Sequence, residues 1–332
     1  MKEFSVSIKD IKEAQETLNG IARRTPLIKS FYLTSITGGE VFTKHENMQL
    51  TGSFKFRGGY NKVHSLTQEE KDKGVIACSA GNHSQGVALA SKLLGVKAKI
   101  FMPETAPKAK VAATEGYGAQ VIQHGPTFDD CKDGCNIERE KTGETFLHPY
   151  DDEKVIAGQG TIGLEILEDM WDVDNVICPI GGGGIISGIA IALKSFNPNI
   201  KVIGVQADNV HGMKASFDKG ELTEHFTAPT VADGTAVKYP GELTFEIVKE
   251  LVDEIVTVSE EELELAMKDL MQRCKQVVEG AGALPTAAVL SGKVDKYLPN
   301  KKTVLVISGG NVDLKKVSEV CDHFMYQEPE KK

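Results

Sequence analysis

Short apolar runs that alternate with helical patterns are the feature that most limits the fold of this chain. VIAC (75–78), KAKIFM (97–102) and NVICPI (175–180) are such runs, and helical patterns lie between them. Strands that are apolar throughout are typical of parallel sheets covered by helices on both faces. The sequence therefore predicts an α/β protein.

Read along the chain, the alternation predicts two lobes. We expect strands at 75–78, 97–102, 119–123, 145–148, 175–180, 201–205 and 303–307, and helices over 7–23, 85–94, 107–114, 129–141, 161–170 and 185–196 and after Ser259. Each lobe is expected to be an open, mostly parallel, twisted sheet flanked by helices. Ligands of such sheets lie beyond the carboxyl ends of the strands, so the loops there are the candidate site.

The charge balance argues against a nucleic-acid coat protein. The 332 residues include 38 Lys and Arg against 47 Asp and Glu, which gives a formal net charge of −9. No run approaches the roughly 20 apolar residues of a membrane span, and the first residues lack the apolar core of a secretory signal. We expect a cytoplasmic protein without nucleic-acid or membrane partners.

The cysteines and the single tryptophan are interpreted as structural residues. Six cysteines in so long a chain do not have the density of a disulfide framework, so we expect reduced thiols. Cys131 and Cys135 lie one helical turn apart, but no second cysteine pair or neighbouring histidine completes a zinc site. We expect no metal site, packing roles for both cysteines, and burial of Trp171.

Four glycines follow the run NVICPI and precede a predicted helix: Gly181, Gly182, Gly183 and Gly184. Successive glycines let N–H groups converge without obstruction by Cβ, and the helix N-terminus adds partial positive charge. Such a loop suits a phosphate. Neither a P-loop nor GxGxxG is present, so we expect a phosphorylated cofactor. A flexible turn is the alternative.

A second loop, TGSFKFRGG (51–59), places Lys55 between two phenylalanines. Apolar surroundings disfavour the ammonium form of a lysine and so expose the neutral amine that forms imines. Taken alone, the loop fits a solvated surface lysine better, because the chain has 38 basic residues.

Two further strand ends carry polar groups: CSAGNH (78–83) and SGGN (308–311). Ser79, Asn82 and His83 present small polar groups and N–H donors where a helix starts, which could hold a carboxylate. Helix capping by Ser79 or Asn82 is the alternative. The Ser308 hydroxyl could simply bond a turn.

In this order the four loops resemble the pyridoxal-phosphate enzymes of the tryptophan-synthase-β type (fold type II), and among them the serine/threonine dehydratases. The resemblance runs from about Ile8 to Leu314. It includes ENMQLTGSFKFRGG, SAGNHSQGVA, PYDDEKVIAGQGTIGLEI, GGGG, VADG and SGGNVD. The chain is similar to the single-domain catabolic threonine dehydratases.

The resemblance implies pyridoxal 5'-phosphate in the cleft between the lobes and assigns roles to the loops. Lys55 would be the Schiff-base lysine and the general base. Around the cofactor, Phe54 would pack near the ring, Asn82 would bond the phenolic oxygen, Ser308 would face the pyridine nitrogen, and Gly181 to Gly184 would hold the phosphate. Ser79, Asn82 and His83 would receive the substrate carboxylate. Glu279 matches a position near the ring, although a surface acid fits the sequence equally well. The implied domains are 1–47 with 151–322 (large), 48–150 (small) and a charged tail, 323–332.

The implied reaction is β-elimination of L-threonine, and of L-serine, to 2-oxobutanoate or pyruvate and ammonia. Serine racemase is the nearest alternative. Its pattern has a second serine where Ala80 stands, and its cation site has acids where Gln206 and Gly212 stand, so the dehydratase is favoured. A non-catalytic regulator would have lost Lys55 or the glycine loop, and neither is lost.

The resemblance also implies regulation and assembly. An AMP effector at a subunit interface would involve Thr51, Gln85 and Asn311, although nothing in their chemistry demands a nucleotide. We expect a homodimer or a homotetramer.

Overall fold

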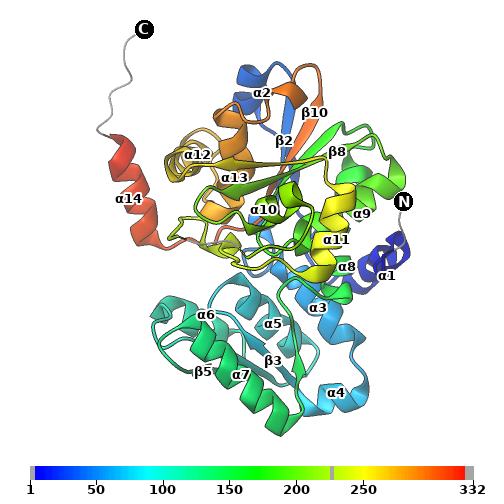
Figure 1. Cartoon of the computed structure of the whole chain (residues 1–332), viewed down its shortest axis with the longest axis vertical. Coiled ribbons are helices and arrows are strands. Elements are labelled where there is room, and N and C mark those ends of the chain that lie inside the picture. Colours follow the sequence, from blue (N-terminus) through cyan, green and yellow to red (C-terminus); the bar gives the residue numbers. More distant parts are fainter. Residues whose placement is uncertain (1–3, 225–227, 326–332) are drawn as a thin grey trace.

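The computed structural model describes residues 4–224 and 228–325, which form two lobes with one sheet each (Figure 1). The strands are β1 (Leu27–Lys29), β2 (Glu40–His45), β3 (Val75–Cys78), β4 (Ala98–Met102), β5 (Gln120–Gln123), β6 (Thr145–Phe146), β7 (Asn175–Pro179), β8 (Lys201–Ala207), β9 (Glu254–Val258) and β10 (Lys302–Ile307).

The helices lie between these strands and after the last one. They are α1 (Ile8–Leu18), α2 (Phe31–Thr37), α3 (Lys55–Ser65), α4 (Gln68–Lys73), α5 (Asn82–Leu93), α6 (Lys108–Gly116), α7 (Phe128–Thr142), α8 (Glu153–Asp169), α9 (Gly184–Phe196), α10 (Gly212–Lys219), α11 (Glu242–Leu251), α12 (Glu260–Gln272), α13 (Gly280–Leu290) and α14 (Leu314–Met325), with 3-10 turns η1 (Glu46–Met48), η2 (Asp233–Thr235) and η3 (Asp295–Tyr297).

Both sheets are mostly parallel. The large lobe has the strand order β1-β2-β10-β7-β8-β9, and the small lobe has the order β5-β4-β3-β6. Only the pair β1 and β2 is antiparallel among these neighbours. The predicted α/β class with two lobes is confirmed. The division at residues 48 and 151 stays a prediction, and residues 326–332 of the predicted tail lie outside the described part of the chain.

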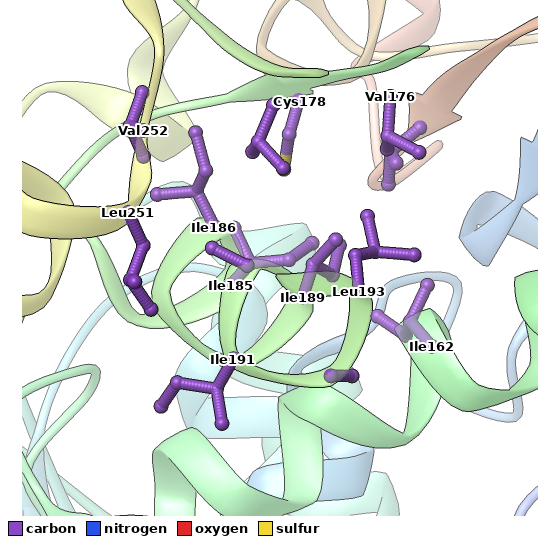
Figure 2. Packing of buried hydrophobic residues seen from close by; sticks show 14 of the residues in the cluster. Ile162, Val176, Cys178, Ile185, Ile186, Ile189, Ile191, Leu193, Leu251 and Val252 are labelled. Atoms are coloured by element: carbon purple, nitrogen blue, oxygen red, sulfur yellow. The ribbon is translucent and has the colours of Figure 1, made fainter. Parts of the chain in front are cut away.

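The large-lobe sheet is buried on both faces because alternate side chains of a strand point in opposite directions. Val176 and Cys178 of β7 pack with Ile189 of α9 on one face (Figure 2). Ile177, between them, belongs to the core that α12 and α13 cover on the other face. Each fully buried side chain of this kind contributes roughly 1.5–3 kcal/mol, so one central strand anchors helices on both sides.

The small lobe repeats this arrangement around β3. Val75 and Ala77 share a core with residues of α3 and α5. Ile76 and Cys78 face the other way, into a smaller cluster with α7. The carboxyl end of β3 therefore leads directly from the interior into the loop before α5.

The structure corrects two expectations. Trp171 was expected to be buried but is 73% exposed, because it follows the end of α8 and lies outside the core. The helix expected at 161–170 begins at Glu153, where the Asp152 carboxylate accepts from the N–H groups of Lys154 and Val155. No helix in the described part of the chain is long and apolar enough to cross a membrane.

Candidate active site

The lysine loop is attached by its backbone to the end of β10. The Phe54 N–H donates to the Ser308 carbonyl at 3.1 Å, and the Gly310 N–H donates to the Gly52 carbonyl at 2.9 Å. Gly52 has φ of +72°, and an added Cβ would lie 2.4 Å from the Asn311 Oδ1, so glycine is required there. Two loops that are far apart in the sequence thus form one edge of the site.

The Lys55 amine extends from the first turn of α3 to the segment before α8. Its Nζ donates to the Pro149 carbonyl at 2.7 Å and lies 5.2 Å from the centre of the Phe54 ring. Burial lowers the pKa of Lys55 to about 8, partly opposed by the charge of Glu279. A lowered pKa is what the sequence predicted for a lysine flanked by apolar rings, and the role of Lys55 as the imine-forming amine stays a prediction. Phe56, the other flanking ring, instead packs in the small-lobe core.

The four glycines form the turn between β7 and α9. Gly183 has φ of +99°. The backbone N–H groups of Gly181, Gly182 and Gly183 donate no hydrogen bond to another described residue. Unpaired N–H groups at a helix N-terminus attract an anion, so this turn has the donors that a phosphate needs.

Tyr150, which the sequence analysis did not single out, covers this turn. A Cβ on Gly182 would lie 2.4 Å from carbons of the Tyr150 ring, and one on Gly184 would lie 2.9 Å from the Tyr150 Cβ. The Tyr150 hydroxyl donates to the Tyr239 carbonyl at 3.1 Å. Because Pro149 holds the Lys55 amine, two adjacent residues connect the amine to the glycine turn. The motif PYDDEKVIAGQGTIGLEI was the available signal.

Asn82 is the centre of a polar cluster. Its Nδ2 donates to Glu279 Oε1 at 2.7 Å, and its Oδ1 accepts from Asn311 Nδ2 at 2.8 Å. The Asn311 Nδ2 also donates to the Thr51 carbonyl. Of the residues expected to contact an effector, Asn311 therefore touches Asn82 directly, and Thr51 is connected to Asn82 through Asn311. Gln85, the third, is buried on the next turn of α5.

The residues expected to receive a carboxylate lie at the start of α5. The Ser79 hydroxyl accepts from the Gly81 N–H at 3.2 Å, and Gly81 occupies the cap position. The His83 Nε2 donates to the Leu147 carbonyl at 2.8 Å. Burial and the nearby Lys55 lower the pKa of His83 to about 3, so its ring is neutral. The Ser79 hydroxyl, which only accepts in this bond, and backbone N–H groups at the start of α5 are donors left for a carboxylate, and this role stays a prediction.

A buried ion network holds α3 in place, and sequence reasoning did not find it. The Arg57 guanidinium donates to Glu46 at 2.8 Å and to Glu165 at 2.6 Å, and the Lys44 Nζ donates to Glu165 at 2.5 Å. These charges come from η1, α3, α8 and β2 and are nearly inaccessible to solvent. Removing one partner of such a network leaves a buried charge without a counter-ion, which is strongly destabilising. The network therefore fixes the position of the helix that begins at Lys55.

The position of the racemase cation site is filled by a neutral amide. The Gln206 Nε2 donates to the Ile180 carbonyl at 3.3 Å, and its Oε1 accepts from the Lys214 N–H at 2.8 Å. Gln206 is fully buried. Its amide thereby connects the residue before the glycine turn to α10.

These residues fit the phosphorylated aldehyde cofactor that the sequence implies. The glycine turn has free N–H groups, and the Lys55 amine has a lowered pKa. The Ser308 hydroxyl is almost buried and bonds no described residue. An anion site, an imine-forming amine and a hydroxyl donor are thus present on neighbouring loops, as such a cofactor requires.

Glu279 gives the site a pH-dependent stability. Its buried position, together with the charge of Asp233, raises the pKa of Glu279 to about 7. A folded-state pKa above the unfolded value means that stability falls as pH rises from about 4.5 to about 7, by on the order of 3 kcal/mol. In denaturant unfolding of the cofactor-free protein, we expect wild type to lose more stability between pH 5 and pH 8 than Glu279→Gln. The exposed Glu261→Gln is the control, and equal losses in all three would contradict the prediction.

The comparisons with known proteins agree with this geometry. The family described as pyridoxal-phosphate dependent enzymes matches residues 18–310. The chain is 61% identical over 320 residues to the catabolic L-threonine dehydratase TdcB of Staphylococcus aureus (strain USA300), covering 96% of this chain and 92% of the relative. It superimposes on maize serine racemase with a TM-score of 0.92 at 34% identity, covering 96% and 98% of the two chains. It superimposes on the processed form of threonine deaminase isoform 2 from Solanum lycopersicum with a TM-score of 0.90 at 36% identity, covering 98% of this chain and 96% of the other.

Proposed function

Because this chain belongs to the pyridoxal-phosphate dependent enzymes, we propose that it deaminates L-threonine, and L-serine, by β-elimination to 2-oxobutanoate or pyruvate and ammonia. The observation that carries the proposal is the connection of the Lys55 amine, through Pro149 and Tyr150, to the glycine turn with its free N–H groups. The 61% identity to a catabolic L-threonine dehydratase supports it.

The chain's own residues supply binding and proton transfer. Pyridoxal phosphate, when bound, supplies an aldehyde carbon for the amine and a ring that takes up negative charge. Gly181 to Gly184 would hold its phosphate, and Phe54, Asn82 and Ser308 would surround its ring. The Lys55 amine is the general base for the Cα proton, because its lowered pKa leaves part of it neutral near pH 7. Ser79, Asn82 and His83 would orient the substrate carboxylate.

Serine racemization is the second candidate, because maize serine racemase shares the fold so closely. Racemization needs a proton carrier on the substrate face opposite the lysine. Ala80, which packs against the small-lobe core, carries no exchangeable side-chain proton. The dehydratase is therefore the better supported of the two.

A product assay separates these candidates. Wild-type enzyme is incubated with L-threonine and with L-serine, and the 2-oxo acids and the chirality of the remaining serine are measured. We expect 2-oxobutanoate and pyruvate with no appreciable D-serine. D-serine formed at a rate comparable to pyruvate would overturn the choice.

The lowered pKa of Lys55 also sets how the cofactor-free protein reacts with pyridoxal phosphate. Only the neutral amine attacks, and its fraction grows as pH rises towards the pKa of about 8. We expect the rate of appearance of the visible absorbance band to rise from pH 6 and level off above about pH 8. Nα-acetyl-lysine, whose amine titrates near 10.4, is the reference, and an enzyme profile that follows it would contradict this prediction.

We further propose a cytoplasmic homodimer or homotetramer that responds to AMP. The bonds from Asn311 to Asn82 and to the Thr51 carbonyl support this proposal, because an effector touching Asn311 or Thr51 would act on Asn82. With millimolar AMP we expect a lower KM for threonine and a change in oligomeric size. If both stayed constant, the effector proposal would be wrong.

A further inference from the structure

Two thiols of the small lobe touch at the base of the substrate loop. Cys78 is the last residue of β3 and directly precedes Ser79, and Cys131 lies in the first turns of α7. Their sulfur atoms are 3.3 Å apart, although the residues are 53 positions apart in sequence. Both thiols are free and buried, and no step of the proposed reaction uses them.

The surroundings make Cys131 the more reactive thiol of the pair. The N-terminus of α7, capped by Thr127, favours negative charge on a nearby thiolate. The contact between the two thiols lowers the pKa of Cys131 and raises the pKa of Cys78. Cys135, one turn further along α7, has its pKa raised to about 12 by burial. It is therefore a natural control.

We propose that Cys78 and Cys131 are a redox modification site, which a peroxide converts into an intramolecular disulfide that disturbs the Ser79–Asn82 loop. The Cys131 thiolate attacks one peroxide oxygen, the O–O bond breaks, and Cys131 sulfenic acid and hydroxide form. The Cys78 thiol then attacks the Cys131 sulfur and releases the sulfenic oxygen as water. Two thiols are oxidised, and one hydrogen peroxide is reduced to two waters.

The disulfide changes the position of the loop because its bond is shorter than the present contact. A disulfide S–S bond is about 2.0 Å long, so the sulfurs must approach by about 1.3 Å from their separation of 3.3 Å. Cys78 is continuous with Ser79, whose N–H donates to the Phe101 carbonyl and whose hydroxyl accepts from the Gly81 N–H. A shift at Cys78 is thereby passed to the start of α5.

Access to the pair is through α7. The cluster that covers the two sulfurs contains few buried residues, among them Ile76 and Phe101. Phe128 and Ile137 of α7 are each more than half exposed. A helix held by so small a core opens locally at lower free energy than the large-lobe core, which admits a molecule of peroxide size.

The test treats holoenzyme with a small excess of hydrogen peroxide, followed by alkylation in denaturant and digestion. We expect the loss of two of the six thiols, a linked peptide pair containing Cys78 and Cys131, and at least a threefold loss of kcat/KM that dithiothreitol reverses. Six remaining thiols would overturn the proposed site. A linked pair with unchanged kcat/KM would overturn its coupling to the loop.

Matched variants assign the chemistry. In Cys131→Ser we expect no linked peptide and no dithiothreitol-reversible inhibition, whereas Cys135→Ala should behave as wild type. In Cys78→Ala we expect the oxidised Cys131 to persist as a sulfenic acid that dimedone labels. If either Cys131→Ser or Cys78→Ala is unstable, the remaining variant still tests the proposal. Equal reversible inhibition in Cys131→Ser would overturn the proposal. The linked peptide is detected without any substrate. Failure of the disulfide proposal is therefore distinguishable from failure of the proposed dehydratase activity, on which the kcat/KM measurement rests.

Discussion

The Lys55→Ala variant is expected to lose the elimination reaction, with kcat/KM reduced at least about 10³-fold. A positioned general base alone contributes about 10²–10⁴-fold, and Lys55 is also the residue that we propose to link covalently to the cofactor. The visible absorbance band of the bound enzyme should disappear in the same variant. Both quantities are measured on protein reconstituted with pyridoxal phosphate.

Lys97→Ala is the control for this experiment. Lys97 is an exposed lysine of the same lobe, in the loop before β4, and its removal should change neither the rate nor the spectrum. Far-UV circular dichroism shows whether Lys55→Ala is folded. If folded Lys55→Ala kept the band and the rate of wild type, the assignment of the lysine would be wrong.

Gly182→Ala is expected to weaken cofactor binding at least tenfold and to destabilise the fold by about 1–3 kcal/mol. The added methyl would lie 2.4 Å from carbons of the Tyr150 ring, so the ring or the turn must move, and forced repacking of this kind costs about that much. The displaced turn would no longer aim its N–H groups at one phosphate. Titration with pyridoxal phosphate and denaturant unfolding measure the two effects.

A double variant identifies the cause. In Gly182→Ala/Tyr150→Ala the clash is absent, so part of the lost stability should return relative to Gly182→Ala. Gly116→Ala is the matched control, because a Cβ at the end of α6 meets nothing within 4 Å, and it should be neutral or slightly stabilising. Additive losses in the double variant would show that Tyr150 is not the obstacle.

The parts of the fold that the sequence predicted are those with a strong local pattern. The apolar runs at β3, β7 and β10 stand out because both faces of these strands are buried, and the loops after them were found by position alone. Helix α3 was not predicted, because Gly58 and Gly59 are poor helix formers. The structure explains the glycine at position 58. A Cβ on Gly158 of α8 would lie 2.7 Å from the Gly58 Cα, so the close packing of α3 against α8 requires glycine.

The parts of the site that the sequence missed depend on contacts between distant segments. The environment of Glu279 was undecided, and it is buried because Asn82 and Gly309 approach it from elsewhere in the chain. Tyr150 lies within a quoted motif, but nothing local in that motif indicates its partner, the glycine turn 32 to 34 residues further along. Pairings of this kind have no periodicity in sequence.

The backbone bonds between the lysine loop and the end of β10 attach this loop to the large lobe, whereas other residues of the candidate site belong to the small lobe. Ser53 and Gly309 form an antiparallel bridge. The lysine loop is thereby hydrogen-bonded to the segment that follows the large-lobe sheet, and the glycine turn follows a strand of the same sheet. Ser79 and Asn82 belong to the small lobe. The small-lobe residues that we propose to bind the substrate carboxylate and the turn that we propose to hold the phosphate are therefore carried by different sheets, so a substitution at Ser79 can change substrate preference without moving the glycine turn.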